Sequence, residues 1–270
     1  MDALHEFIDL HTAEGCVALA DELSASASFT MTLRQVEEQA LLRGVMPRRL
    51  IRNCLSCAQQ LRLLRSRVSI IGCGGLGGTV AEILTRLGVG SLRLVDPDSF
   101  EEHNLNRQRF ATVETLGSSK VNAARSALTA INPATEIDAV QTEFSEPDIL
   151  ASEVIVDCLD SAGKRLVLAS LCKQHNRPLV HGAVQEWYGQ IGISTAKNDL
   201  IAGMYPPAFH DTESAPPPRV IAPTVSAIAS MQAAEACKLL LDLPSVLIGN
   251  WLSCNLLDTE YERIPVAPRP

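Results

Sequence analysis

A glycine-rich segment is the first part of the chain whose residue types and spacing point to chemistry. Four glycines form a G-x-G-G-x-G run, namely Gly72, Gly74, Gly75 and Gly77. The run follows the apolar residues 68–71 and precedes a stretch with helical spacing. Such a strand–loop–helix unit turns backbone N–H groups toward phosphate oxygens. Asp96 ends the next apolar stretch, where an acidic side chain can bind ribose hydroxyls. This pattern alone fits NAD, FAD and ATP equally.

Two basic residues distinguish between these nucleotides. Arg107 lies in an N-L-N-R-Q segment that begins at Asn104 and ends at Gln108, and Lys120 lies 13 residues after Arg107. Two cations near a phosphate cradle suit a triphosphate, because its charge must be neutralised while a nucleophile approaches the α-phosphorus. A hydride-transfer site has no such need. The pair therefore favours ATP, and the alternative is that both are solvated surface charges.

An acidic segment supplies a candidate metal ligand. Asp157-Cys158-Leu159-Asp160 comes directly after the apolar residues 154–156. In open α/β sheets the ligand crevice lies at the carboxyl ends of the strands. An aspartate there can bind magnesium, since this hard cation prefers oxygen ligands shared with phosphates. The alternative is that one of the two aspartates only caps a helix.

Alternating strands and helices must bring these residues together. From Arg67 onward, short apolar runs alternate with helical patterns, which is typical of a parallel α/β sheet. The predicted strands are residues 68–71, 91–95, 154–156, 179–183 and 190–194, followed by a closing hairpin of residues 246–252 and 255–264. The predicted helices run from the glycine segment to Gly88, from Ser118 or Ser119 to Asn132, and over residues 224–241. We expect a turn at Tyr188-Gly189.

The chain is predicted to consist of a helical N-terminal extension, residues 1–44, and one main domain, residues 45–270. Residues 32–42 carry apolar positions at near-helical spacing, and Ser24–Ser28 is interpreted as a separator between two helical pieces. Residues 204–223 are rich in proline and are expected to form a long loop, which in a compact domain is usually functional or disordered.

Composition restricts the classes of function. The 270 residues are 46% hydrophobic and 20% charged, as in ordinary globular proteins. The formal net charge of −8 argues against a nucleic-acid-binding surface. No apolar run approaches the length of a membrane span, and the first residues lack the basic region of a signal peptide. We therefore expect a cytoplasmic protein in which the eight cysteines are reduced thiols.

The combined order of the motifs resembles a known family. G-x-G-G-L-G, D-x-D at Asp96 and Asp98, N-L-x-R-Q, a lysine that begins a helix, and D-C-x-D occur in this order. This order resembles the MoeB/ThiF/HesA family of ubiquitin-activating-enzyme-like adenylyltransferases. The likeness covers roughly residues 47–264, and the combination is far more specific than any single motif. The resemblance implies a Rossmann-like mixed sheet with helices on both faces, and a homodimer.

The resemblance also implies a role for each matching residue. The nucleotide site would contain Gly72, Gly74, Gly75, Gly77, Asp96, Asp98, Asn104, Arg107, Gln108 and Lys120. Within it, Asp96 would bind the ribose and Asp160 the magnesium. The phosphates would be bound by Asn104, Arg107 and Lys120. The catalytic set would consist of Arg52, Arg107, Lys120 and Asp160.

Arg52 enters through a second motif of the family. In relatives, an arginine before the first strand of the nucleotide-binding unit reaches the γ-phosphate in the neighbouring subunit, and it lies in an R-Y-x-R pattern. Arg49-Leu50-Ile51-Arg52 is similar to that pattern, with Leu50 in place of the tyrosine. The likeness nominates Arg52, and Arg48 is the rival.

Two features of many relatives are missing. Their structural zinc is bound by two C-x-x-C pairs, but residues 202–205, where the first pair would fall, hold no cysteine, and none follows Cys254. Cys54 and Cys57 form the only C-x-x-C, which is half of a tetrahedral site, so we expect no zinc. Residues 213–223, where some relatives carry a reactive cysteine, also hold none. We therefore expect the chemistry to end at an acyl-adenylate.

The sequence thus predicts an adenylyltransferase that uses ATP and Mg²⁺. Its expected acceptor is the C-terminal carboxylate of a small ubiquitin-like sulfur-carrier protein that ends in glycine. Neither nucleic acid nor a membrane is expected as a partner. One alternative is adenylation of the C-terminus of a short peptide. Two others are an NAD-dependent oxidoreductase and a nucleotide-binding scaffold without catalysis.

Overall fold

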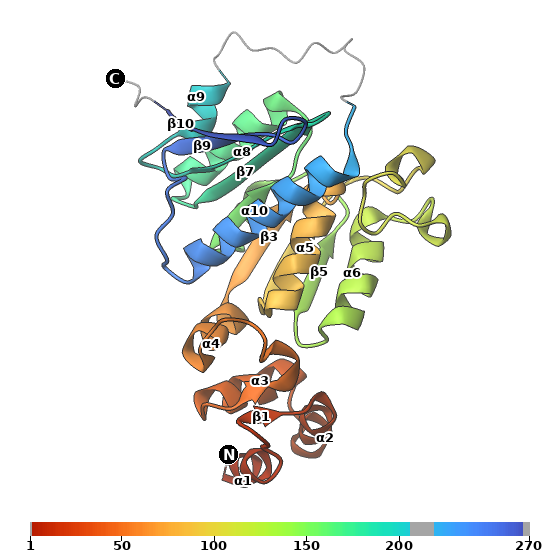
Figure 1. The fold of residues 1–270 in the computed structure, drawn as a ribbon. Helices are drawn as coiled ribbons and strands as arrows, with labels where there is room; N and C mark the ends of the chain where they lie inside the picture. Colours follow the sequence, from red (N-terminus) through yellow and green to blue (C-terminus); the bar gives the residue numbers. More distant parts are fainter. Residues whose placement is uncertain (1, 206–218, 267–270) are drawn as a thin grey trace.

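An eight-stranded sheet forms the centre of the molecule (Figure 1). The structure, a computed structural model, describes residues 2–205 and 219–266. In spatial order the strands are β10 (Glu260–Pro265), β9 (Asn250–Asn255), β8 (Tyr188–Ser194), β7 (Leu179–Gln185), β6 (Val154–Asp157), β3 (Arg67–Ile71), β4 (Ser91–Val95) and β5 (Glu136–Val140). Neighbours from β5 to β7 pair in parallel, whereas those from β7 to β10 pair antiparallel. The sheet is therefore mixed, as predicted.

Helices cover both faces of this sheet, which confirms the predicted architecture. One face carries α5 (Gly75–Leu87), α6 (Lys120–Ile131) and α10 (Ala222–Leu240), which lie in front of the sheet in Figure 1. The other carries α7 (Glu146–Leu150), α8 (Ala162–Gln174) and α9 (Leu200–Met204). Successive side chains of a strand point to opposite faces. Accordingly, Val68 and Ile70 of β3 are buried in the core under α5, and Ile71 in the core under α8.

The elements that carry the nucleotide motifs lie where the sequence predicts them. α5 ends at Gly88, whose φ of +82° closes the helix in the left-handed region that glycine adopts readily. α6 begins after Ser119 and ends at Asn132. The closing hairpin is also present, but both strands begin later than predicted, β9 by four residues and β10 by five. β5 and the helices α7, α8 and α9 were not predicted.

The predicted turn at Tyr188-Gly189 is wrong. Gln185 pairs with Tyr188, so the turn between β7 and β8 consists of Glu186 and Trp187, and Glu186 adopts a φ of +52°. Gly189 lies inside β8, where a Cβ would approach Ile228 of α10 to 2.3 Å. The glycine therefore serves the packing of a helix on the sheet.

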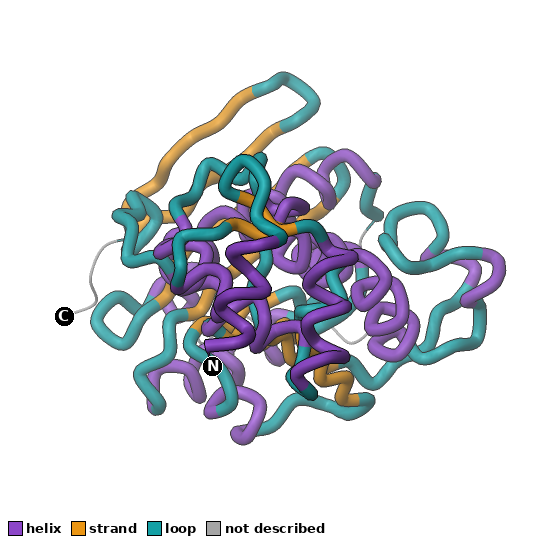
Figure 2. The backbone as a smooth tube through the Cα atoms, turned by 90° about the horizontal axis from the view of Figure 1, so that it is seen from below, coloured by secondary structure: helices purple, strands orange, loops and turns teal. Residues whose placement is uncertain are grey.

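The N-terminal segment forms a separate small cluster of helices below the sheet in Figure 1, and Figure 2 views the molecule from that end. It contains α1 (Asp2–Leu10), α2 (Leu19–Phe29) and α3 (Leu33–Leu42), and the parallel strand pair β1 (Cys16–Val17) and β2 (Met46–Pro47). The 3₁₀ turn η1 (Arg48–Leu50) and α4 (Cys57–Arg65) connect it to β3. The interpretation of Ser24–Ser28 as a separator is wrong, because these residues lie within α2 and Ala25 is buried.

Part of the predicted proline-rich loop, residues 206–218, lies outside the described residues. Within the described ranges, no helix combines the length and the apolar character needed to cross a membrane.

Candidate nucleotide-binding site

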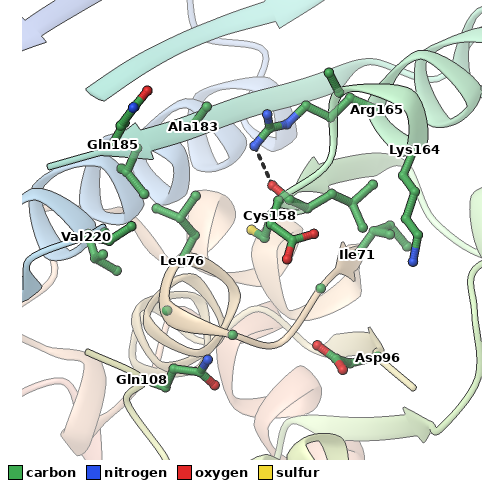
Figure 3. Close-up of a pocket in the computed structure, with 18 of the residues that line it drawn as sticks. Ile71, Leu76, Asp96, Gln108, Cys158, Lys164, Arg165, Ala183, Gln185 and Val220 are labelled. Carbon is green, nitrogen blue, oxygen red and sulfur yellow. Dashed lines mark hydrogen bonds between the residues drawn. The ribbon is translucent and has the colours of Figure 1, made fainter. Parts of the chain in front are cut away.

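A pocket of about 780 Å³ opens at the carboxyl ends of β3, β4 and β6 (Figure 3). It brings together most of the residues that the sequence nominates for the nucleotide site. Those that line it are Gly72, Gly74, Gly75, Asp96, Asp98, Arg107, Gln108, Lys120 and Asp160. This volume is within the usual range for a small-molecule site.

The glycine loop is shaped by close approaches between backbone segments. Gly72 has a φ of +91°, and a Cβ there would lie 2.7 Å from the carbonyl oxygen of Cys158. Gly77 lies outside the residues that line the pocket, and a Cβ on it would lie 1.8 Å from the carbonyl oxygen of Gly72. Gly77 therefore lets the first turn of α5 pack directly on the loop. Only glycine at these positions permits this arrangement.

Asp96 connects two of the loops that form the pocket. Its Oδ2 accepts a hydrogen bond from Cys73 N–H at 2.6 Å, and its Oδ1 accepts one from Asp98 N–H at 2.8 Å. Burial raises the pKa of Asp96, while the charge of Lys120 and the two backbone N–H groups lower it. Each oxygen retains a further lone pair for a ligand. The predicted contact with the ribose stays a prediction.

The two predicted cations differ in their surroundings. Lys120, the first residue of α6, is only 7% exposed, and its Nζ lies 2.8 Å from Asp98 Oδ2. Arg107 is half-buried and donates to the carbonyl oxygen of His103 at 3.0 Å and to Asn106 Oδ1 at 2.8 Å. Lys120 is therefore no solvated surface charge. Both cations line the pocket, as a site for a polyphosphate requires.

The amide residues Asn104 and Gln108 of the N-L-N-R-Q segment differ in location and in hydrogen bonding. Asn104 is buried outside the pocket lining, and its Oδ1 accepts from Glu101 N–H at 3.0 Å, so it braces the loop that carries Arg107. Gln108 lies against Gly74, and its Oε1 is buried without a hydrogen-bond partner among the described residues. A buried unpaired amide group at a pocket wall is expected where a ligand completes the hydrogen bonding.

The two aspartates of the acidic segment also have different roles. Asp160 is exposed and lines the pocket, whereas Asp157 is fully buried. Neither caps α8, because Ser161 does so by accepting from Lys164 N–H. The described residues hold no cluster of three or more histidine, cysteine or carboxylate side chains placed to bind a metal. A magnesium ion at Asp160 would thus take its other oxygen ligands from phosphates and water, as it commonly does.

Sequence reasoning missed a buried polar network beneath the pocket. His181, in an otherwise apolar part of β7, is fully buried, and its Nδ1 lies 2.7 Å from Asp157 Oδ2. Burial lowers the pKa of His181, although the carboxylate of Asp157 raises it. Gln190 Nε2 lies 3.2 Å from His181 Nε2 and donates to the hydroxyl of Tyr205 at 3.0 Å. A histidine within an apolar strand was the one signal that the sequence offered.

Arg165 extends this network to the acidic segment. Its guanidinium donates to the carbonyl oxygen of Leu159, the hydrogen bond that is dashed in Figure 3. It also contacts Asp157 Oδ2 at 3.5 Å, while Leu159 N–H donates to Asp157 Oδ1 at 3.0 Å. Both polar groups of Leu159 are therefore fixed by side chains. This arrangement orients the next residue, Asp160, toward the pocket.

The structure does not bring Arg52 to the pocket of its own chain. Its neighbour Leu50 contacts Gly88, at the carboxyl end of α5, whereas the glycine loop lies at the amino end. The 13 residues of α5 separate these ends by about 20 Å. Arg48 and Arg52 are exposed, and their side chains form no ion pair with the described residues. Arg49 is instead paired with Glu22 and Glu37.

Known proteins are similar to this chain along most of its length. It is 30% identical over 217 residues to the "SAMP-activating enzyme E1" of Haloferax volcanii, covering 78% of this chain and 80% of that protein. It is 29% identical to the "Molybdopterin-synthase adenylyltransferase" of Escherichia coli, covering 88% and 97%. It is 35% identical to "Adenylyltransferase and sulfurtransferase MOCS3" of Drosophila grimshawi over 77% of this chain. The match covers 48% of that relative, so this chain spans about half of its length.

A solved structure and a family profile agree with this result. The "Microcin C7 biosynthetic enzyme MccB in complex with N-formylated MccA" has the same fold, with a TM-score of 0.66, 16% identity, and coverage of 92% of this chain and 84% of that one. The profile described as "ThiF family" matches residues 48–270, which include every residue that lines the pocket. The chain belongs to the ThiF family.

Proposed function

We propose that the protein uses ATP and magnesium to adenylate the C-terminal carboxylate of a small ubiquitin-like sulfur-carrier protein. The last residue of this acceptor would be a glycine. The observation that carries the proposal is one pocket in which a glycine loop meets Arg107, Lys120 and Asp160. The names of the relatives, an activating enzyme and adenylyltransferases, support it. The nicotinamide alternative has no such support.

The proposed reaction uses these residues to neutralise charge. The triphosphate lies along the glycine loop, where backbone N–H groups and the amino end of α5 favour anions. Lys120 and Arg107 reduce the repulsion between the phosphates and the incoming carboxylate. A carboxylate oxygen of the acceptor attacks the α-phosphorus, the bond to the bridging oxygen breaks, and pyrophosphate leaves. Magnesium bound at Asp160 would supply further charge neutralisation at the phosphates.

The other end of the pocket is suited to the tail of the acceptor. Tyr188 and Gln190 of β8 and Trp251 and Ser253 of β9 line it, on one face of the antiparallel strands. An extended chain laid along this face would bring its terminal carboxylate to the glycine loop. The proposed unit for this chemistry is the main domain, residues 45–270, acting as a homodimer with residues 1–44 as an accessory helical extension.

The wild-type protein is expected to catalyse exchange of labelled pyrophosphate into ATP only when magnesium and a suitable acceptor are present. The acceptors to compare are a ubiquitin-like protein ending in glycine, the same protein without that glycine, and a peptide of its last ten residues. We expect exchange with the first alone. Calorimetry should detect binding of ATP and none of NAD.

Three results would contradict the proposal in different ways. Binding of NAD without ATP would remove the adenylation assignment. Exchange with the peptide at the rate of the whole protein would move the acceptor to the class of short peptides. ATP binding with no exchange for any acceptor that ends in glycine would favour a scaffold without catalysis.

The acceptor is expected to remain a non-covalently bound acyl-adenylate, without a thioester to the enzyme. Among the described residues, Cys158 is the one thiol that lines the pocket, and burial raises its pKa well above the usual range. A protonated thiol is a poor nucleophile. A denaturing gel without reductant should therefore show no adduct after incubation with ATP and acceptor. A thiol-sensitive adduct that disappears in Cys54→Ser or Cys158→Ser would place the protein among thioester-forming enzymes.

A further inference from the structure

Arg49 lies between two buried carboxylates that come from different helices of the N-terminal extension. Its Nη1 lies 2.6 Å from Oε2 of Glu22 in α2, and its Nη2 pairs with Oε1 of Glu37 in α3. Its Nε donates to Oδ1 of Asn132, the residue that ends α6, at 3.2 Å. One guanidinium thus connects two helices of the extension to the main domain.

The burial of this cluster costs desolvation free energy that apolar side chains would not cost. Glu22 is 0% exposed and Glu37 is 1% exposed, so two carboxylates share a single cation away from water. Burial raises the pKa of Glu22 to about 7, although the charge and the hydrogen bond of Arg49 lower it. Apolar side chains of the same volume are often as stabilising as a buried ionic cluster. A buried ionic cluster can instead fix the relative geometry of the elements that it joins.

The geometry that is fixed here is that of the turn around Arg52. Before it, Arg49 is bound as described and Leu50 contacts Gly88 at the end of α5. After it, Asn53 Nδ2 lies 3.2 Å from Gln60 Oε1 and 3.5 Å from the carbonyl oxygen of Leu87. Ile51 and Arg52 are the exposed residues between these anchors. The turn therefore carries, between two bound residues, an exposed guanidinium that forms no ion pair with the described residues.

The position of the turn excludes a contact between Arg52 and the pocket of its own chain. The anchors of the turn lie at the carboxyl ends of α5 and α6, whereas Gly75 and Lys120 of the pocket lie at the amino ends. The 12 residues of α6 correspond to about 18 Å, similar to the length of α5. If Arg52 contacts the phosphates of a nucleotide, that nucleotide must therefore be bound by a second copy of this chain.

We propose that Arg49 is a positioning residue: by binding Glu22, Glu37 and Asn132 it holds the turn that presents Arg52 to the nucleotide pocket of a second subunit. The N-terminal helices α2 and α3 are thereby part of the catalytic apparatus. This inference rests on the proposed function, and it assigns a task to the extension, which precedes the part of the chain matched by the family profile.

A double-mutant cycle in pyrophosphate exchange tests the coupling between the two arginines. Arg52→Ala should lower kcat by about a hundredfold or more, since an arginine that contacts transferring phosphates from another chain contributes a large factor. Arg49→Met should lower kcat to within several-fold of this, and Arg49→Met/Arg52→Ala should lose no more than Arg52→Ala alone. Glu22→Gln/Glu37→Gln in the Arg49→Met background removes the unpaired carboxylates and should restore the melting temperature without restoring kcat.

Arg65→Met is the matched control, because it removes another ion pair of the same region, the one between Arg65 of α4 and Glu38 of α3. It should leave kcat and KM unchanged. Additive losses in the double variant would overturn the inference. So would recovery of kcat together with the melting temperature in the charge-free variant, because Arg49 would then act through stability alone.

Mixed dimers supply a readout that a folding defect cannot imitate. An Arg49→Met chain and an Asp160→Ala chain are each expected to be nearly inactive alone. Mixed, they form dimers in which one pocket has an intact Asp160 and receives Arg52 from a subunit with an intact Arg49, so part of the exchange activity should return. Wild-type exchange without any return in the mixture would refute the inference and leave the proposed function standing. Absence of exchange in the wild type with every acceptor that ends in glycine would refute both.

Discussion

Replacement of Asp160 by alanine is expected to lower pyrophosphate exchange by about a thousandfold or more, with the fold intact. Asp160 is the exposed carboxylate at the end of β6, and it faces the pocket from a segment whose shape is set by Asp157 and Arg165. Its side chain contributes nothing to a core, so the variant should keep the melting temperature of the wild type within a few degrees. Exchange with labelled pyrophosphate at saturating ATP is the measurement.

The control for Asp160→Ala is Asp242→Ala, which removes an exposed carboxylate paired with Arg62 far from the pocket. It should exchange at the wild-type rate. Titration of the Asp160→Asn variant with manganese, which tolerates a weaker ligand set, should recover part of the activity. Near-normal exchange by Asp160→Ala in magnesium would show that the metal is bound elsewhere.

Lys120→Met is expected to lower kcat for exchange by roughly 10²–10³-fold and to weaken the binding of ATP. The reason is that Lys120 is the buried cation of the pocket, with its Nζ 2.8 Å from Asp98 Oδ2 and 3.9 Å from Asp96 Oδ1. Its loss removes a positive charge from the phosphate site and leaves the two carboxylates unneutralised. The pKa of Asp96, which burial already raises, should rise further because Lys120 lowers it. Calorimetry for ATP and exchange kinetics measure the two effects.

Lys173→Met provides the comparison for Lys120→Met. Lys173 lies on α8, is 52% exposed and pairs with Asp199. Its replacement should change neither the affinity for ATP nor kcat. Lys120→Arg keeps the charge and should retain more activity than Lys120→Met. If Lys120→Met bound ATP and exchanged pyrophosphate like the wild type, Arg107 alone would be sufficient for the triphosphate.

The parts of the structure that the sequence predicted are those with local signals. A buried strand, glycines at a fixed spacing and a helix that ends at Gly88 all act within about twenty consecutive residues, and the structure contains them where they were expected. The repetition of such units predicted a parallel α/β sheet, whereas the mixed sheet with helices on both faces was implied by the resemblance to the family. Glycine was a misleading signal at Gly189, because the reason for this glycine is Ile228 on a helix far away in the sequence.

The rest depended on contacts between distant residues. Some ion pairs join separate elements, namely Asp157 with His181 and Arg49 with Glu22 and Glu37. No spacing in the sequence predicts these pairs. Likewise, the serines of Ser24–Ser28 were misread because α2 packs on α1 and α3, and Ala25 is buried in the core that these helices share. Tertiary contacts override local propensity at such positions.

The pocket has a consequence for synthesis on the ribosome. Its lining begins at Ile71 in β3 and ends at Ser253 in β9, and β3 must pair with β6 before the glycine loop and the acidic segment can meet. The residues proposed to bind the nucleotide end at Asp160, so a nascent chain carries no complete nucleotide site until that residue has left the exit tunnel. Bound nucleotide stabilises only a state that contains its site. Cellular ATP thus cannot assist the folding steps that precede the synthesis of β6, and it acts as a ligand only once β3 and β6 have paired.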